Sequence, residues 1–489
     1  MSLALLSSPH STPGYYSTST IVIDIHSIMS WESLPNELRF MIFTILLEDS
    51  DKRYRTGFPT VSRQWQDFFE PIFFRRLVVD EPDLSMLSSV TEGSKGFRLS
   101  YIRHLWLRLK LAPYTCRDCQ TSEPRDIIHQ NNARFTRAVY KLLDILARGN
   151  HISCGRGMTL QLSAHSPSDY HHKYRDFRMV DKYPWVTEED LVGNGEFHSQ
   201  HRDLSVKYIQ DTHPEVVSHQ YMAYQPPEMD RFRSTEPLRF DFGKPLFRWS
   251  HTLHRPVVAQ IVLPKVNIVK ALVIPRQFYR NISSSVLAKL LRESFVCLEM
   301  LRDERWLASN SFSKRLCCPE IVLDALPAKL KRLHIYQDAD SDFSLTQVCT
   351  LVGAQSMGTL AVMSELKELS IAPDTDGWGF LLSFFPMLGR CPVDTLPVLK
   401  LRRLALDCGV LREPQRPFDM FILVTSLRAA AAAASHMPQL ETMELWKASP
   451  SSATLFRYST KKFESRITWR INWKRARDDK IWQGELRED

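Results

Sequence analysis

The feature that most constrains the fold is a short word, Leu-x-x-Leu-x-Leu, that recurs along the second half of the chain. Its copies are centred on Leu333, Leu369, Leu404 and Met443, which are 36, 35 and 39 residues apart (333 to 369, 369 to 404, 404 to 443). The alternating apolar residues at the end of the word are typical of a strand with one buried face. Segments with a helical pattern, such as residues 418–435, separate the words. A strand and a helix repeated at a near-constant period indicate an array whose units bury their apolar faces on one another.

Earlier copies of the word cover residues 102–107 and 269–274, and further helices are expected at residues 283–301 and 379–388. The period exceeds the 20–29 residues of a standard leucine-rich repeat. The Asn or Cys that usually closes the strand loop is missing, except at Cys408. We therefore predict an α/β fold with an irregular leucine-rich-repeat-like β/α array. The alternative is a single mixed α/β domain with parallel strands; either arrangement offers a broad binding face rather than a deep catalytic pocket.

A different pattern occupies the N-terminal part of the chain. Leu34, Leu38, Ile42 and Leu46 recur every four residues, which predicts one apolar stripe on a helix. Pro35 is compatible with the start of this helix, because the first turn has no backbone acceptor for the N–H that proline lacks.

A second helix is expected with Val61, Trp65 and Phe68 on one face and Thr60 as its N-cap. A third short apolar segment, residues 72–74, leads to a strand at Leu77–Val79. Such short helices cannot bury this much apolar surface alone. We therefore expect part of the stripe to stay exposed until it meets the rest of the chain or another protein.

Two words in this region, Leu34-Pro35-Asn36-Glu37 and Val61-Ser62-Arg63-Gln64-Trp65, resemble the F-box. The match is closest to F-box proteins of filamentous fungi, which open with Trp-Glu-x-Leu-Pro as residues 31–35 do. The resemblance implies a three-helix module that docks onto the Skp adaptor of a cullin–RING (SCF) ubiquitin ligase. The residues implied in the adaptor interface, or in the small core behind it, are Leu34, Pro35, Leu38, Ile42, Val61 and Trp65. The alternative is an ordinary helical hairpin at the start of a larger domain.

The chain has 489 residues, enough for two or three domains. We expect a disordered leader at residues 1–28, an F-box-like domain at 29–80 and a substrate-binding region at 81–489. Within that region, a long insertion at about residues 164–255 is rich in His, Asp, Tyr and Pro. It follows a strand expected at Met158–Ser163.

Composition excludes some classes and locations. The chain lacks a run of 18 apolar residues, which argues against a membrane span, and residues 1–28 lack the features of a signal peptide. Nine scattered cysteines indicate a reducing compartment, so we expect a cytoplasmic or nuclear location. The net charge of +8 is spread along the sequence and is interpreted mainly as an aid to solubility.

Near the C-terminus, Ile467, Trp469, Ile471 and Trp473 alternate with polar and basic residues. This alternation predicts a half-buried strand that covers the open end of the array. The alternative is a basic strip with interleaved tryptophans for nucleic acid. Base stacking requires exposed rings, whereas a strand places these rings on the face opposite the charges.

The sequence offers little support for catalysis or metal binding. Cys116 and Cys119 form a lone CxxC, whereas structural zinc needs four ligands, and the nearest additional candidates, His129 and Cys154, lack a recognisable spacing. The vicinal pair Cys317-Cys318 and the histidines between residues 165 and 201 also lack a motif. Phosphate-binding and nucleophile-elbow motifs are missing as well. We predict a protein that is not an enzyme and needs no metal or cofactor.

We therefore predict a substrate-recognition subunit of an SCF-type ligase, which binds the Skp adaptor, through it a cullin, and a target protein. Loops at residues 337–343, 374–378 and 407–417 are candidates for the target site, because equivalent loops of a solenoid line up on one edge. Two alternatives remain at this point. One is a scaffold that binds the adaptor without promoting degradation, and the other is an enzyme or nucleic-acid binder with a coincidental F-box-like hairpin.

Overall fold

A computed structural model defines the fold, and the chain divides into two compact units, residues 1–70 and 71–489. None of the helices in the described residues has the length and apolarity needed to span a membrane. The structure describes residues 31–50, 55–115, 118, 121–151, 157–167, 236–242, 247–250, 255–258, 261–275, 280–305, 319–337, 364–373, 377–382, 384, 398–411, 417–448, 452–461, 464–473 and 482–484. The expected leader, residues 1–28, and most of the expected insertion lie outside these ranges.

The predicted N-terminal stripe helix is confirmed as α1 (Asn36–Asp49), which follows a short 3-10 turn, η1 (Trp31–Ser33). The second helix, α3, covers Arg63–Phe73 and follows another 3-10 turn, η2 (Phe58–Thr60).

Two expectations about this second helix were wrong. Thr60 does not cap it, because its hydroxyl donates to the carbonyl of Gly57 (2.7 Å), and Ser62 Oγ instead accepts from the N–H of Trp65 (3.4 Å). The short apolar segment expected at residues 72–74 is not separate either, because α3 continues through Phe73.

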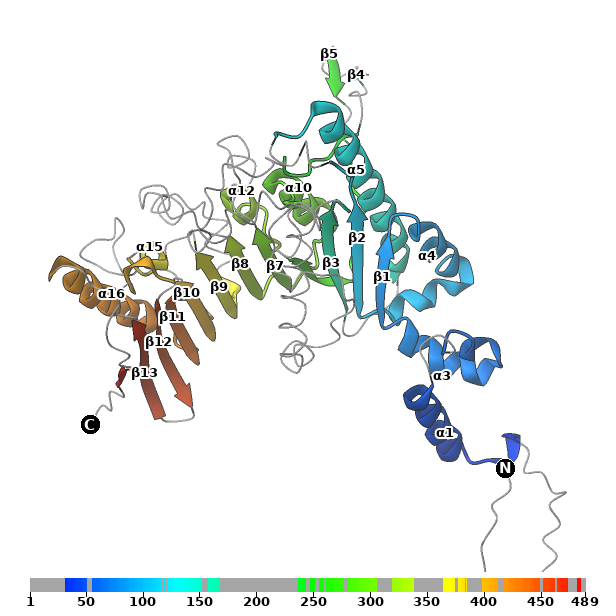
Figure 1. The fold of residues 1–489 in the computed structure, drawn as a ribbon, viewed down its shortest axis with the longest axis horizontal. Helices are drawn as coiled ribbons and strands as arrows, with labels where there is room; N and C mark the ends of the chain where they lie inside the picture. The colour runs from blue at the N-terminus through cyan, green and yellow to red at the C-terminus, as the bar shows by residue number, and fades with distance from the viewer. Residues whose placement is uncertain are drawn as a thin grey trace, which may run out of the picture. The chain divides into compact units, whose positions relative to one another are not determined.

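The second unit is a mixed α/β structure around a twelve-stranded, mostly parallel sheet (Figure 1). The strand order follows the chain order, and the first nine strands of the sheet run parallel to one another. These nine are β1 (Arg76–Asp80), β2 (His104–Lys110), β3 (Met158–His165), β6 (Val269–Ile274), β7 (Met300–Arg305), β8 (Arg332–Gln337), β9 (Glu368–Pro373), β10 (Arg403–Asp407) and β11 (Thr442–Ala448). Strands β4 (Phe247–Ser250) and β5 (Arg255–Val258) form a separate antiparallel pair.

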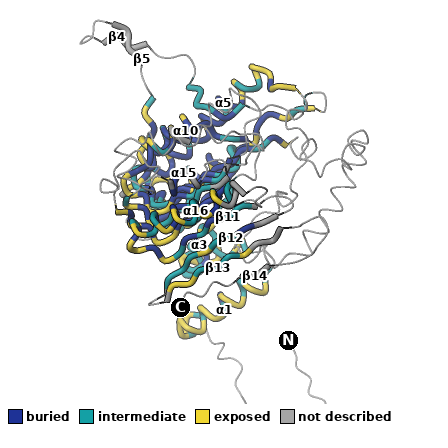
Figure 2. The backbone as a smooth tube through the Cα atoms, turned by 90° about the vertical axis from the view of Figure 1, so that its left-hand side faces the viewer, coloured by how far each residue is buried: buried dark blue, intermediate teal, exposed yellow. Residues whose placement is uncertain are grey.

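Helices connect many of the strands, and the buried backbone is concentrated where α5, α10 and α15 meet the strands (Figure 2). The helical elements are α4 (Leu84–Val90), η3 (Gly93–Ser100), α5 (Arg125–Ala147), η5 (Arg148–His151), α10 (Ser284–Lys289), the π-helical η8 (Leu290–Ser294), α12 (Pro319–Leu323), α15 (Gly377–Leu382), η10 (Gly409–Leu411) and α16 (Pro417–Ser435). The helix expected at residues 418–435 is thus confirmed as α16. Of the helix expected at residues 379–388, residues 379–382 are helical, and 383 and 385–388 lie outside the described residues.

The middle leucine of the sequence word explains how the sheet is held together. In the strand register, one apolar residue from each of eight successive strands pairs with the next, and each is at most 2% exposed: Leu105, Leu160, Leu272, Leu301, Leu333, Leu369, Leu404 and Met443. We call this row the leucine ladder. It buries the same face of every strand, so a shift by one residue in any strand would expose its apolar side chains.

The helix expected at residues 283–301 was partly wrong. The helical segment ends at Ser294, and strand β7 begins at Met300. The repeated word at β7 is Leu298-x-x-Leu301-x-Asp303. An acidic residue stands in place of the third apolar residue, so the apolar pattern did not identify this strand. With β7 included, the ladder residues on either side of it are 29 (272 to 301) and 32 (301 to 333) residues away.

The predicted C-terminal strand is confirmed as β13 (Glu464–Trp473), which pairs with β12 (Ser452–Lys461) and β14 (Trp482–Gly484). These three strands extend the sheet beyond β11 in antiparallel fashion. Trp469 packs against the core with its ring edge toward Phe456 (centroids 6.5 Å apart), while Arg466 and Arg470 are exposed. This tryptophan is therefore committed to packing rather than to an exposed stacking surface.

Candidate functional site

The first unit is organised around an aromatic core. Phe43 of α1 and Phe69 of α3 are fully buried, with ring centroids 5.3 Å apart. Four further rings lie within 6.4 Å of Phe43, centroid to centroid: Trp31, Phe40, Trp65 and Phe68. Aromatic rings fill a small core with few residues, which is why so short a segment has a buried centre at all.

The two parts of the F-box resemblance, residues 31–35 and 61–65, meet in this core. Trp31 opens the Trp-Glu-x-Leu-Pro segment, and its Nε1 donates to Oε1 of Gln64 in the second word at 3.0 Å. The rings of Trp31 and Trp65 lie 6.1 Å apart, centroid to centroid. Trp31 is therefore held by a side-chain hydrogen bond and a ring contact to residues 33 and 34 positions further along the chain.

Outside the core, the same helices expose apolar side chains. On α1, Leu38 is 44% exposed, Met41 58% and Ile45 52%, and Val61 before α3 is 60% exposed. We call these four residues the apolar face. Leu38, Met41 and Ile45 are three and four residues apart and therefore share one side of α1, and large exposed apolar side chains grouped in this way are typical of protein-binding sites. Of the four stripe residues, Leu38 is exposed and Leu34, Ile42 and Leu46 are half-buried, which agrees with the expectation that part of the stripe stays exposed.

The six residues predicted for the adaptor interface have different environments. Leu38 and Val61 belong to the apolar face, and Pro35 is also exposed. Leu34, Ile42 and Trp65 are half-buried, and Trp65 lies within the aromatic core.

Sequence reasoning missed the residues that hold this unit together. Phe43 lies between two residues of the predicted stripe, Ile42 and Leu46, and the four-residue periodicity of the leucines hid it. The available signal was the spacing of the phenylalanines: Phe40 and Phe43 are three residues apart on α1, and Phe68 and Phe69 are adjacent on α3. Residues three or four apart share one helix face.

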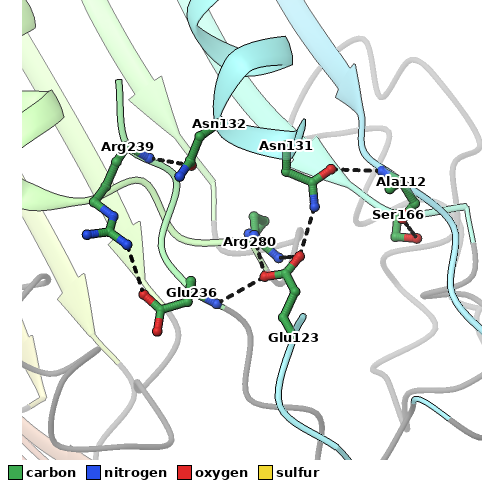
Figure 3. A network of polar contacts seen from close by, with 8 residues as sticks. All are labelled: Ala112, Glu123, Asn131, Asn132, Ser166, Glu236, Arg239 and Arg280. Carbon is green, nitrogen blue, oxygen red and sulfur yellow. Dashed lines mark hydrogen bonds and ion pairs between the residues drawn. The ribbon is translucent and has the colours of Figure 1, made fainter. Parts of the chain in front are cut away.

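The second unit contains a buried polar network beside the start of α5 (Figure 3). Glu123 lies just before the helix and forms a bidentate ion pair with Arg280, with N–O distances of 2.9 and 2.7 Å and side chains only 2% and 5% exposed. Asn131 Nδ2 donates to Oε1 of Glu123 at 2.8 Å, and the Asn131 amide oxygen accepts from the N–H of Ala112 at 2.9 Å. Because both charges are buried, the pair is stable only while these partners stay in place.

The same helix holds a segment that lies within the expected insertion, residues 236–242. The Asn132 amide oxygen accepts from the N–H of Arg239 (2.9 Å), and the Thr136 hydroxyl accepts from the N–H of Asp241 (2.7 Å). The backbone N–H of Glu236 also points to Oε2 of Glu123 (3.4 Å; Figure 3). The sequence signal for this site was the set of polar residues on an otherwise apolar helix face.

A second buried ion pair occurs on β7, where the strand word has its acidic residue. Arg305 contacts Asp303 at 2.6 Å and donates to the hydroxyl of Ser284 at 2.6 Å. Asp303 lies between Ile274 and Ile335 in the register, at a position where neighbouring strands have apolar residues. Arg305 therefore compensates a charge within the hydrophobic layer.

The sheet face opposite the leucine ladder has half-buried polar side chains. His334 of β8 lies 4.0 Å from Glu368 of β9, measured from Nε2 to Oε2, and Arg403 of β10 approaches the same carboxylate at 3.7 Å. Burial lowers the pKa of His334, and the nearby Glu368 carboxylate, which favours the charged ring, only partly offsets this.

This environment predicts a pH dependence of stability. The pKa of His334 is lower in the folded than in the unfolded chain, so the unfolded chain binds more protons below about pH 6.5. His334 therefore makes the free energy of unfolding decrease as the pH falls from about 7.5 to about 5.5. In urea titrations at both pH values, His334→Gln should lose less stability than the wild type. An unchanged pH dependence in that variant, equal to that of the exposed-site control His129→Gln, would contradict the assignment.

Other predicted sites lie largely outside the described residues. Cys116, Cys119 and Cys154 are among these, and the described His129 has its Nδ1 3.5 Å from Oδ2 of Asp241. Within the described part of the chain, no group of three or more His, Cys, Asp or Glu residues is arranged to hold a metal ion.

The predicted target loops at residues 337–343, 374–378 and 407–417 are described only at Gln337, 377–378 and 407–411. In the last of these loops, Asp407 is 2% exposed and pairs with Lys447 at 2.9 Å, so this acidic side chain is not open to a partner.

Comparison with known proteins adds one match. Residues 325–484, from just before β8 to the end of β14, match a family of unknown function, DUF6546. No curated protein matches the chain. The matched range does not include residues 31–77, so the F-box resemblance of that segment stays a prediction.

Proposed function

We propose that this protein is a substrate-recognition subunit of an SCF-type ubiquitin ligase. Its first unit docks onto the Skp adaptor as an F-box, and the second unit presents a target protein to the complex. The protein carries out no chemistry of its own. It acts by tethering, because holding a target beside the ligase raises the effective concentration of the reacting groups. Such a role fits a cytoplasmic or nuclear protein.

The apolar face is the observation that supports this proposal most directly. Leu38, Met41, Ile45 and Val61 are each more than 40% exposed, although they are large apolar side chains. Burial of such side chains stabilises a complex by about 1.5–3 kcal/mol each when it is complete. A neighbouring aromatic core keeps the helices folded, so this face is available to a partner without unfolding.

The second unit supports the part of the proposal that concerns the target. Strand order that follows chain order, together with the leucine ladder, favours the irregular leucine-rich-repeat-like array. Arrays of this kind expose long, regular surfaces that suit a protein target. An alternative within the same class is a scaffold that binds the adaptor but recruits no target for degradation; a cullin pull-down combined with target stabilisation separates the two.

Co-purification with the Skp adaptor tests the proposal. Full-length protein should form a stoichiometric complex with the adaptor, and the double variant Leu38→Ser/Met41→Ser should lose it. Both side chains are exposed, so their replacement removes contact area without opening a cavity. The matched control is Met86→Ser/Val262→Ser, which changes two exposed apolar residues of the second unit and should bind normally.

A second variant tests the helix start implied by the resemblance. Leu34→Ala/Pro35→Ala should abolish adaptor binding while the second unit stays folded, as judged by circular dichroism. If the well-folded wild type forms no complex, or if both serine pairs weaken it equally, the F-box assignment fails.

A further inference from the structure

The amino ends of the nine parallel strands share one edge of the sheet, and this edge is strongly basic. From five residues before each strand to its second residue, the described chain has twelve basic and four acidic side chains. We call the twelve the basic edge: Arg75, Arg76, Arg103, Lys265, Lys270, Lys329, Lys331, Arg332, Lys367, Lys400, Arg402 and Arg403. All except the half-buried Lys270 are exposed. Charges that are scattered along the sequence are thus gathered by the fold into one row.

The repeat itself places these residues. The two variable positions inside Leu-x-x-Leu are Lys331-Arg332 before Leu333 and Arg402-Arg403 before Leu404, while the corresponding pair on β9 is Lys367-Glu368. Because the following leucine is fixed in the ladder, the preceding side chains are fixed at the edge.

Backbone hydrogen bonds hold the row in register. The N–H of Lys331 donates to the carbonyl of Glu299 (2.9 Å), that of Lys367 to Lys331 (2.7 Å), and that of Arg402 to Lys367 (2.8 Å). Neighbouring strands lie about 4.8 Å apart, so basic residues on adjacent strands, such as Arg332 of β8 and Lys367 just before β9, start from backbone positions about this far apart on a rigid support.

Some of these cations are already neutralised within the edge. Lys331 pairs with Glu299 at 2.6 Å and Lys400 with Glu365 at 2.7 Å. Among the described residues, no carboxylate lies within 4.0 Å of a charged nitrogen of Arg103, Arg332 or Lys367. Arg332 is the first residue of β8, Arg103 and Lys367 lie just before β2 and β9, and the three side chains leave positive charge available to a partner.

We propose that the basic edge binds an extended, acidic polypeptide segment of a partner protein. The four acidic residues of this edge, Glu299 at β7, Glu365 and Glu368 at β9 and Glu441 at β11, interrupt the row of positive charges. Each of them would repel the continuous negative charge of a nucleic-acid backbone laid along the edge. A polypeptide can instead place neutral or basic residues opposite the glutamates and acidic residues opposite the cations. Binding of single-stranded nucleic acid also uses a series of exposed aromatic rings on which the bases stack. Among the described residues, Phe97 is the one exposed ring that lies close in sequence to the start of a strand of this row.

This inference goes beyond the proposed function and does not depend on it. The basic edge lies wholly in the second unit, and its binding can be measured without the Skp adaptor. If the basic edge binds no acidic peptide, the proposal of adaptor binding is unaffected. If the protein does not bind the adaptor, the proposal for the basic edge is likewise unaffected.

Fluorescence anisotropy of a labelled acidic peptide tests the proposal on the full-length protein. An Asp-Ser repeat of about 12 residues spans about 40 Å when extended, which is comparable to the width of nine parallel strands. We expect binding at about 50 mM salt that weakens markedly at about 300 mM, because exposed charge pairs are screened. The variant Arg103→Gln/Arg332→Gln/Lys367→Gln should bind about tenfold more weakly, since it removes three exposed charge contacts.

The matched control removes the same net charge elsewhere. Arg125→Gln/Arg292→Gln/Arg428→Gln changes three exposed arginines on α5, η8 and α16, so both variants have three cations fewer than the wild type. Peptide binding by the control should stay within about twofold of the wild type. Thermal melts should show that both variants remain folded, because all six side chains are exposed.

Two results would overturn the proposal. Equal loss of peptide binding in both variants would mean that net charge, and not the row, attracts the peptide. Binding of a labelled single-stranded oligonucleotide by a protein that ignores the peptide would assign the edge to nucleic acid. Loss confined to the edge variant would establish the surface.

Discussion

Replacing Phe43 with alanine is expected to unfold the first unit and leave the second unit folded. Phe43 is fully buried and contacts five other aromatic rings, with centroid distances between 4.9 and 6.4 Å. Removal of a buried phenylalanine ring costs about 3–5 kcal/mol, through lost burial and the cavity that remains. A unit this small has little stability to spare.

Hydrogen exchange measured by mass spectrometry will report this change locally. Peptides from α1 should lose protection in Phe43→Ala, whereas peptides from β8 to β11 should exchange as in the wild type. The control is Phe40→Ala, three residues earlier on the same helix, whose ring is 47% exposed. If both substitutions lower the protection of α1 equally, the buried aromatic core is not what holds the unit together.

The second large effect is expected at the buried pair in the second unit. Glu123→Ala should lower the free energy of unfolding by about 3–5 kcal/mol, because Arg280 would keep a buried charge without its partner. The same change removes the acceptor for Asn131, so the start of α5 loses a second contact. Urea unfolding followed by circular dichroism measures the loss.

A double variant separates the charge from the packing. Glu123→Met/Arg280→Met replaces both charges with apolar side chains, and it should recover much of the stability lost in Glu123→Ala. The exposed pair Lys400–Glu365 is the matched control: at 53% exposure of each side chain, Glu365→Ala should cost less than about 1 kcal/mol. A similar small cost at Glu123 would show that the buried pair is not a strong contribution to stability.

The sequence was sufficient to predict most of the parallel strands, because these carry the same buried face. Leu333, Leu369 and Leu404 repeat one pattern, and the structure pairs them directly. Strand β7 was not predicted because Asp303 breaks that pattern. Its partner Arg305 is two residues further along the chain, and nothing in the sequence indicates that the two form a buried ion pair. Periodicity detects apolar burial, and it misses a core position whose charge is neutralised by a neighbour.

The polar sites were harder to predict, because their members are far apart in the chain. Glu123 and Arg280 are 157 positions apart and meet only once the sheet brings β2, β3 and β6 together. The basic edge has a similar origin: a net charge that looks evenly spread along the sequence becomes a row when repeats stack. On the first unit, the leucine stripe indicated the exposed face, whereas the ring-to-ring packing of Phe43 and Phe69 depends on how two helices cross.

The strand order also bears on how the molecule is made. Each parallel strand of the large sheet hydrogen-bonds to the strand that precedes it in the chain order of the sheet. A ribosome delivers the strands in the same order, and domains generally begin to fold during synthesis. When a parallel strand after β1 emerges, the strand with which it pairs has already been synthesised. Its pairing therefore does not depend on a segment that is still to be translated. The sheet can lengthen in step with translation, and the unpaired edges exposed at any moment are those of β1 and of the strand added last.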